Sequence, residues 1–291
     1  MLNIGWFSTG RDEAARQLLQ AVQGDIHNGN IHGKISFVFS NREPGESLET
    51  DLFFDLVRSY NLPLICLSHR KFKSRLLPLR GVYPERDSSV ALLPQNDKRR
   101  RAQGHNNIPL AEEDWRLRYD REVRKRIEKF ASDVCVLAGY MLIIGEELCQ
   151  EYNMINLHPA IPGGPVGSWQ EVIWDLIENK AQKTGAMIHL LTPELDRGPV
   201  VAYCAFPIRG EPFDPYWQEG DKDMLFQLIR QHELAREFPL IISTLKALSQ
   251  GEISITGGKV IDAQGKTING YDLSEKVNGA VKGKIASLRS Q

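Results

Sequence analysis

Residues 132–141 read SDVCVLAGYM, and residues 154–158 read MINLH. The first stretch is almost continuously apolar, which is typical of a strand buried on both faces of a parallel sheet. In the second, Asn156 and His158 alternate with Leu157, so their side chains point to the same face. Together the two stretches predict a buried sheet that carries a polar pair at the end of one strand.

Strand-like and helix-like segments alternate on both sides of these stretches. Further strands are expected at residues 2–7, 34–40, 62–68, 185–192 and 199–208. Helices are expected at residues 12–23, 51–60, 114–130, 168–180 and 221–250, the last broken or kinked at Pro239. This alternation predicts an α/β fold with a doubly wound, mostly parallel sheet, in which ligands bind at the carboxyl ends of the strands.

We interpret residues 1–291 as a single domain with one insertion and a short β extension at the C-terminus. Residues 70–112 are rich in Lys, Arg, Pro and Asn, and they contain KRRR at 98–101. A solvated loop is the simplest interpretation, and the alternative is a lid that brings positive charge to an anionic substrate. Residues 251–291 carry short strands, as in EISITGGKVI, and polar turns.

The composition of the chain limits the classes of partner that we expect for it. Its formal net charge of -1 gives no global field that would recruit nucleic acid or an acidic membrane. No apolar run approaches the roughly 18 residues that a membrane helix needs, and the first residues do not resemble a signal peptide. The four cysteines form no CxxC pair and are expected as small thiols in a reducing compartment. We therefore expect a cytoplasmic protein, a monomer or homodimer, that acts on small molecules.

A third polar residue, Asp196, follows a predicted strand in the stretch PELDRGPVV. An amide can donate to a developing oxyanion, an imidazole can move a proton, and a carboxylate can accept one from an attacking amine. Asn156, His158 and Asp196 would therefore suit acyl transfer if they meet at one edge of the sheet. The alternative is that each residue only forms a turn or caps a strand.

Two blocks of the chain carry a family resemblance. VLAGYMLIIGEELCQEYNMINLHPAIPGGPVGSW (136–169) and TGAMIHLLTPELDRGPVV (184–201) resemble the folate-dependent formyltransferases, most closely those of purine synthesis. The resemblance implies an enzyme that transfers a formyl group from 10-formyltetrahydrofolate to the amine of glycinamide ribonucleotide, without a metal.

The resemblance also implies roles for individual residues. Asn156 would bind the formyl oxygen, His158 would stabilise the oxyanion, and Asp196 would position His158 and relay a proton. His189 matches a family histidine near the site, although a role in the core is equally open. The pterin ring of the folate would lie against the following residues: Met141, Leu142, Ile144, Glu194 and Leu195. A flat heteroaromatic ring needs such an apolar slot with exposed backbone donors and acceptors.

The acceptor half of the site departs from the family pattern. The family has a glycine-rich phosphate loop after the first strand, and this chain has Ser8, Thr9, Gly10 and Arg11 there. These residues could hold a phosphate at a helix N-terminus, with a charge-assisted contact from the Arg11 guanidinium. The two acidic residues that follow oppose an anion, or they simply complement the helix dipole. The alternatives are formylation of another amine, such as an amino sugar or methionyl-tRNA, and hydrolysis of 10-formyltetrahydrofolate.

Overall fold

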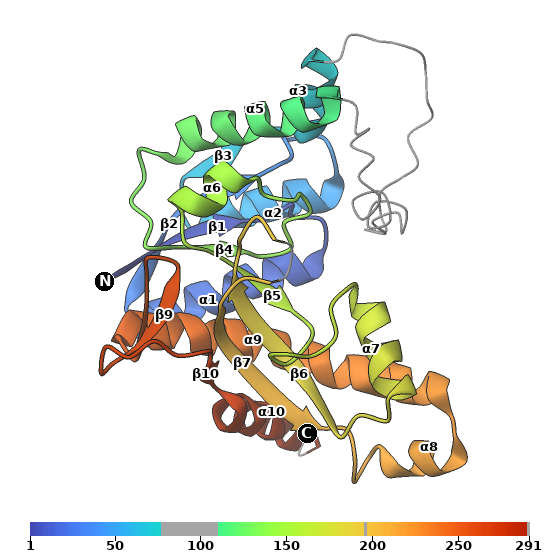
Figure 1. The fold of residues 1–291 in the computed structure, drawn as a ribbon. Helices are drawn as coiled ribbons and strands as arrows, with labels where there is room; N and C mark the ends of the chain where they lie inside the picture. Colours follow the sequence, from blue (N-terminus) through green and yellow to red (C-terminus); the bar gives the residue numbers. More distant parts are fainter. Residues whose placement is uncertain (77–109, 195–196, 290–291) are drawn as a thin grey trace.

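The computed structural model describes residues 1–76, 110–194 and 197–289. Over these ranges the chain forms a central sheet of eight strands with helices on both faces (Figure 1). The strands of this sheet are β1 (Leu2–Phe7), β2 (Gly33–Ser40), β3 (Leu64–Cys66), β4 (Val134–Leu137), β5 (Met154–His158), β6 (Lys183–Leu190), β7 (Val200–Pro207) and β10 (Tyr271–Asp272). A separate antiparallel hairpin consists of β8 (Ile253–Thr256) and β9 (Lys259–Asp262).

The helices connect these strands. They are α1 (Glu13–His27), α2 (Leu48–Ser59), α3 (His69–Leu76), α5 (Leu110–Ile127), α6 (Glu146–Glu151), α7 (Trp169–Glu178), α8 (Asp214–Glu219), α9 (Lys222–Gln250) and α10 (Ser274–Arg289). No helix within the described ranges has the length and hydrophobicity of a transmembrane segment.

The sheet has the order β10-β7-β6-β5-β4-β1-β2-β3. Strands β3, β2, β1, β4 and β5 are mutually parallel, whereas β6 runs antiparallel to both of its neighbours. The sheet is therefore mostly parallel and doubly wound, as the alternation predicts. The direction of winding reverses between β1 and β4, and ligands of such sheets bind in the crevice at this reversal.

Three groups of buried side chains hold the layers together. The first lies between the sheet and α1, α2, α9 and α10. The second packs α5 and α6 against the other face of β1, β2 and β4, and the third joins α7 and α8 to the first half of α9. Because the second group reaches β5 only at Met154, α5 and α6 leave the remainder of that face over β5 and β6 uncovered.

Helix α7 begins at a cap that Ser168 forms. The Ser168 hydroxyl accepts a hydrogen bond from the Glu171 N–H at 3.3 Å, and the Glu171 carboxylate accepts one from the Ser168 N–H at 2.8 Å. This reciprocal capping box fixes the helix start and therefore the end of the loop that follows β5.

Several expectations about secondary structure need correction. The expected break at Pro239 is absent: α9 is one continuous helix, with buried Ile229 and Arg236 before the proline and buried Leu240 and Ile241 after it. This packing offsets the roughly 3 kcal/mol that a proline costs inside a helix. Strand β3 is shorter than the expected 62–68, spanning only Leu64–Cys66.

Two helices lie where loops or turns were expected. Residues 69–76 form α3 instead of the start of the insertion, and the remainder of that segment, residues 77–109 with KRRR, lies outside the described ranges. Ser274–Arg289 forms α10 in the C-terminal extension, where only strands and turns were expected. Its polar composition and Gly279 weaken the helical signal, yet Val277 and Val281 are buried one turn apart.

Candidate active site

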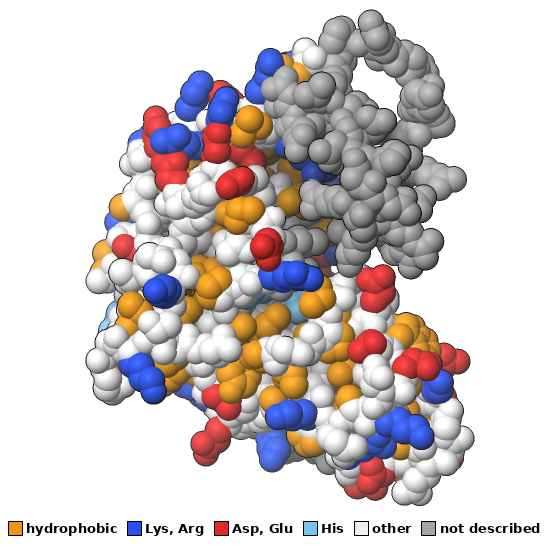
Figure 2. Space-filling view, viewed as in Figure 1, with side chains coloured by type: hydrophobic (Ala, Val, Ile, Leu, Met, Phe, Trp, Pro, Cys, Tyr) orange, Lys and Arg blue, Asp and Glu red, His pale blue; other side chains and the backbone are white. Residues whose placement is uncertain are grey.

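Asn156 and His158 lie on the face of β5 that α5 and α6 leave uncovered. Asn156 is level with Leu137 of β4 on one side and with His189 of β6 on the other. Paired residues of neighbouring strands share a face, so Asn156, His158 and His189 point the same way. Figure 2 shows a small area of histidine among hydrophobic side chains near the middle of the view.

His158 is held by the loop that follows it. Its side chain is buried, with 3% of the residue exposed, and its Nε2 lies 3.3 Å from the carbonyl oxygen of Pro165. A carbonyl oxygen can only accept, so Nε2 carries a hydrogen and donates it. The other ring nitrogen, Nδ1, therefore remains to accept or donate a proton toward a ligand.

His189 lies beside His158 on the neighbouring strand β6. Its ring stands edge-on to the ring of His158, with 6.3 Å between the centroids and 83° between the planes. Its Nδ1 lies 3.0 Å from the carbonyl oxygen of Leu190, to which it donates. His189 is thus buried in the sheet and adjacent to His158.

The loop after β4 is fixed at both ends. The Met141 N–H donates to the Thr9 hydroxyl at 3.0 Å, and the Gly145 N–H donates to the Asp120 carboxylate at 2.6 Å. A Cβ at Gly145 would lie 2.3 Å from that carboxylate oxygen, so only glycine allows this contact. The sequence does not mark Asp120 as a site residue, because nothing in a charged helix distinguishes one aspartate from its neighbours.

Burial gives Asp120 an unusual titration. Loss of hydration raises the pKa of its carboxyl to about 6, although the Gly145 N–H and then Arg116 act to lower it. The Asp120 side chain is buried between α5 and the start of α6, with 5% of the residue exposed. The anchor of the loop is therefore a carboxyl group that titrates close to neutral pH.

The predicted donor residues of this loop differ in exposure. Met141 presents 41% of its surface, whereas Ile144 is buried and Leu142 packs against the side-chain group under α5 and α6. Of the three, Met141 is therefore the side chain best exposed to a ligand, and Leu142 and Ile144 support the backbone behind it.

The loop after β6 contains the other predicted donor residues. Glu194 is exposed, and its carbonyl oxygen accepts from the Thr192 hydroxyl at 3.0 Å. Leu195 and Asp196 lie outside the described residues. A cavity of about 300 Å³ borders this loop and is lined by Leu190, Leu191, Thr192, Pro193 and Pro199, by Cys149, Gln150, Tyr152 and Asn153, and by Gly257 and Gly258. Neither Glu194 nor the three predicted residues of the β4 loop line it.

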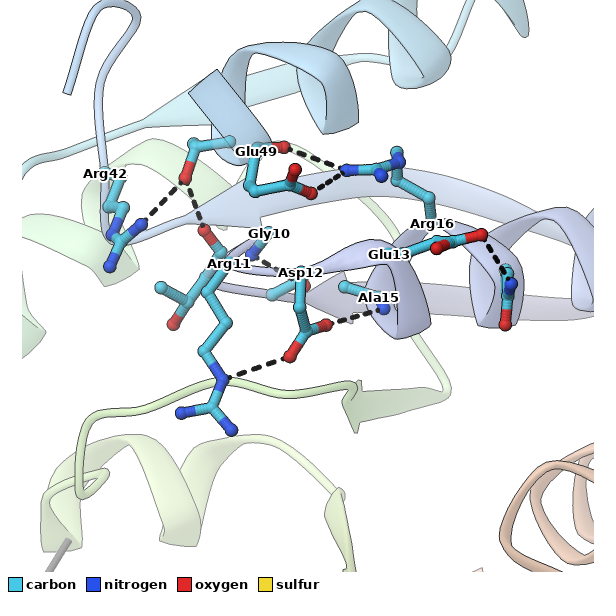
Figure 3. A network of polar contacts seen from close by, with 12 residues as sticks. Gly10, Arg11, Asp12, Glu13, Ala15, Arg16, Arg42 and Glu49 are labelled. Carbon is cyan, nitrogen blue, oxygen red and sulfur yellow. Dashed lines mark hydrogen bonds and ion pairs between the residues drawn. The ribbon is translucent and has the colours of Figure 1, made fainter. Parts of the chain in front are cut away.

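The predicted acceptor residues after β1 are already engaged with one another (Figure 3), and Thr9 is also engaged with the β4 loop. The Ser8 hydroxyl accepts from the Gly10 N–H at 3.1 Å, and the Thr9 hydroxyl accepts from Met141. Asp12 caps α1 by accepting from the Ala15 N–H at 3.0 Å, and it pairs with Arg11 at 3.2 Å. The start of α1 is therefore closed by a carboxylate of the chain itself.

Comparison with known proteins finds a similar sequence family and similar solved structures. Residues 87–212 match the sequence family described as "Formyl transferase". A phosphoribosylglycinamide formyltransferase of Escherichia coli (strain K12) is 34% identical over 132 residues, which are 45% of this chain and 57% of that protein. One of Dictyostelium discoideum is 36% identical over 103 residues, 32% of this chain and 50% of that protein. The chain therefore spans about half the length of these curated relatives.

Solved structures agree on the fold. The phosphoribosylglycinamide formyltransferase of Coxiella burnetii has a TM-score of 0.61 at 18% identity, over 93% of this chain and 98% of that one. Glycinamide ribonucleotide transformylase 1 of Symbiobacterium toebii has a TM-score of 0.57 at 19% identity, over 89% and 93%. The family match over residues 87–212 and the curated relatives confirm the resemblance to formyltransferases that the sequence predicts, and the solved structures confirm the fold.

Proposed function

We propose that the chain transfers a formyl group from 10-formyltetrahydrofolate to the amine of glycinamide ribonucleotide. The observation that carries this proposal is the common face of Asn156, His158 and His189 on the uncovered part of the sheet. Curated relatives named phosphoribosylglycinamide formyltransferase support the choice of substrates.

In this proposal the formyl carbon arrives already activated on the carrier nitrogen. The acceptor nitrogen attacks that carbon, the bond to the carrier nitrogen breaks, and one proton moves from the acceptor amine to the carrier. The chain must align the two substrates and stabilise one negative oxygen while this occurs. No group is oxidised or reduced in this transfer.

The proposed roles of Asn156 and His158 follow from the atoms that each can direct toward a substrate. The Asn156 amide donates to the formyl oxygen, and its position beside Leu137 brings it next to the loop that carries Met141. His158 uses Nδ1 toward the substrate, because Nε2 donates to Pro165. A protonated Nδ1 then adds a second donor to the oxyanion, where each donor is worth about 3–4 kcal/mol of barrier.

Asp196 keeps the role that the family resemblance implies. As a carboxylate near His158 it would favour the imidazolium form and accept the proton of the acceptor amine through water. The donor would lie between the β4 loop, at Met141, and the loop of Glu194, which borders the cavity described above. Leu195 belongs to that second loop.

An assay with a panel of amines tests the proposal. Purified protein is mixed with 10-formyltetrahydrofolate and, separately, with glycinamide ribonucleotide, an amino sugar phosphate, methionyl-tRNA or no amine. Release of tetrahydrofolate and formylation of the amine are both measured. The proposal expects both products with glycinamide ribonucleotide only. Tetrahydrofolate and formate without any amine would instead identify a hydrolase, and product with another amine would replace the acceptor.

A further inference from the structure

Three arginines follow the carboxyl ends of neighbouring parallel strands. Arg11 comes after β1, Arg42 after β2 and Arg70 after β3, and these strands lie side by side in the sheet. Their ends meet at the edge of the sheet where His158 ends β5, because β1 to β5 are parallel. The arginines therefore share an edge with the candidate active site.

Arg42 is the central member of this group. Its guanidinium donates to the Thr50 hydroxyl at 3.0 Å, a contact drawn in Figure 3. Burial lowers the pKa of Arg42, and the positive charges of Arg70 and then Arg11 lower it further, against Glu46. Arg42 thus lies within electrostatic range of Arg70 and of Arg11, and an anion bound at Arg42 would relieve this repulsion.

The neighbouring carboxylates pair with Arg11 and Lys71 and not with Arg42 or Arg70. Lys71 pairs with Glu43 at 2.8 Å and with Glu46 at 3.7 Å. Within the described part of the chain, neither Arg42 nor Arg70 forms an ion pair with a carboxylate. Arg42 and Arg70 therefore hold positive charge that no carboxylate of the described residues pairs with, whereas Arg11 is paired with Asp12.

A buried amide lies in the same place. Asn41 is 1% exposed, and its side-chain oxygen has no hydrogen-bond partner among the described residues. The Nδ1 atom of His69 lies 3.0 Å from the backbone carbonyl oxygen of Asn41, to which it must donate. The same Nδ1 atom lies 3.4 Å from the side-chain nitrogen of Asn41. One ring nitrogen cannot donate and accept at once. Both contacts are satisfied when the Asn41 side-chain amide is turned so that its oxygen faces the Nδ1–H of His69. The NH₂ group of Asn41 then occupies the other, buried position and is a donor without a partner among the described residues.

A chain of hydrogen bonds links this group to the candidate donor loop. Arg42 donates to the Thr50 hydroxyl, which donates to the Thr9 carbonyl oxygen at 3.3 Å, and the Thr9 hydroxyl accepts from Met141. Three strand spacings separate β2 from β5, which corresponds to about 14 Å. A substrate with an amine at one end and an anion at the other could span this distance.

We propose that Arg42, Arg70 and Asn41 bind the phosphate of the acceptor, with Arg11 at the rim of the site. The start of α1 is capped by Asp12, so guanidinium groups after β2 and β3 hold the anion instead of the helix N–H groups. The identity of the acceptor rests on the proposed formyl transfer, but the phosphate site does not depend on that chemistry.

Binding of ribose 5-phosphate, with ribose as the comparison, tests the site by calorimetry. The variants are Arg42→Ala and the exposed Arg70→Ala, whose replacement leaves the core untouched. Arg58→Ala is the matched control, because Arg58 is an exposed arginine of α2 that pairs with Asp55. We expect roughly 10- to 100-fold weaker binding in both test variants and unchanged binding in the control.

The outcomes separate this proposal from the proposed function. Wild-type binding of ribose 5-phosphate that Arg42→Ala and Arg70→Ala leave unchanged overturns the phosphate site, and so does absence of binding to the wild type. If binding depends on both arginines while no amine is formylated, the site stands and the proposed function falls. Kinetics with glycinamide ribonucleotide add a further check, since the acceptor KM should rise in both variants while the folate KM stays constant.

Discussion

Replacement of Asp120 by Asn should change how stability responds to pH. The asparagine keeps a side-chain oxygen that can accept from the Gly145 N–H, so it can form the same hydrogen bond that Asp120 forms at 2.6 Å. It removes the group that titrates. The variant therefore isolates the consequence of burying a carboxyl group in this place.

The magnitude follows from the pKa of Asp120. Burial raises the pKa of this carboxyl from 3.8 to about 6, so the folded protein holds a proton more tightly than the unfolded chain. The stabilisation that this proton brings is complete below pH of about 4 and is lost as the pH rises through 6. Integration from pH 8 to pH 5 gives a gain of about 1.4 kcal/mol in the wild type that the variant lacks.

Urea unfolding at pH 5, 6, 7 and 8 measures this difference. The unfolding free energy of the wild type, relative to Asp120→Asn, should rise by about 1.4 kcal/mol on going from pH 8 to pH 5. Parallel pH profiles for the two proteins would refute the reasoning, because they would show that Asp120 titrates alike in the folded and unfolded chain. Asp55→Asn, on the exposed side of α2, serves as the control.

Three further changes test other parts of the structure. Glu233 is 0% exposed and burial raises the pKa of its carboxyl to about 8, so Glu233→Gln should avoid a loss of about 1.4 kcal/mol that the wild type suffers between pH 7 and pH 9; identical urea midpoints at both pH values would contradict this. Gly145→Ala should lower the unfolding free energy by about 1–3 kcal/mol, since the new Cβ displaces the Asp120 carboxylate; an unchanged melting temperature would show that the loop has another anchor. Ser168→Ala removes the capping box of α7 and should cost about 1 kcal/mol by denaturant unfolding, and no cost would mean that the cap is redundant.

The sequence predicts the sheet well because its strands are marked by composition. The apolar run around β4 and the alternation in MINLH identify two central strands and the shared face of Asn156 and His158. The pattern could not show that β6 runs antiparallel to β5, since alternation of buried residues is the same in either direction. Nor could it show that α9 survives Pro239, which depends on packing along the whole helix.

The remainder of the candidate site depends on contacts between distant segments. Asp120 meets Gly145 from another helix, and Arg42 meets Arg70 only because β2 and β3 are neighbours. Single residues of these types are common in charged helices and turns, so no local pattern singles them out. The predicted phosphate role of Ser8, Thr9, Gly10 and Arg11 depends on one loop. The arginines of the proposed phosphate site instead follow three neighbouring strands, which only the folded sheet brings together.

The transfer rate of His158→Ala tests the central claim most directly. Single-turnover transfer from 10-formyltetrahydrofolate to glycinamide ribonucleotide is measured for the wild type, for His158→Ala and for His32→Ala, which changes an exposed histidine before β2. Loss of one oxyanion donor should slow transfer by on the order of a hundredfold or more in His158→Ala, with its far-ultraviolet circular dichroism unchanged, while His32→Ala keeps the wild-type rate. Transfer at the wild-type rate by a folded His158→Ala protein would contradict the account.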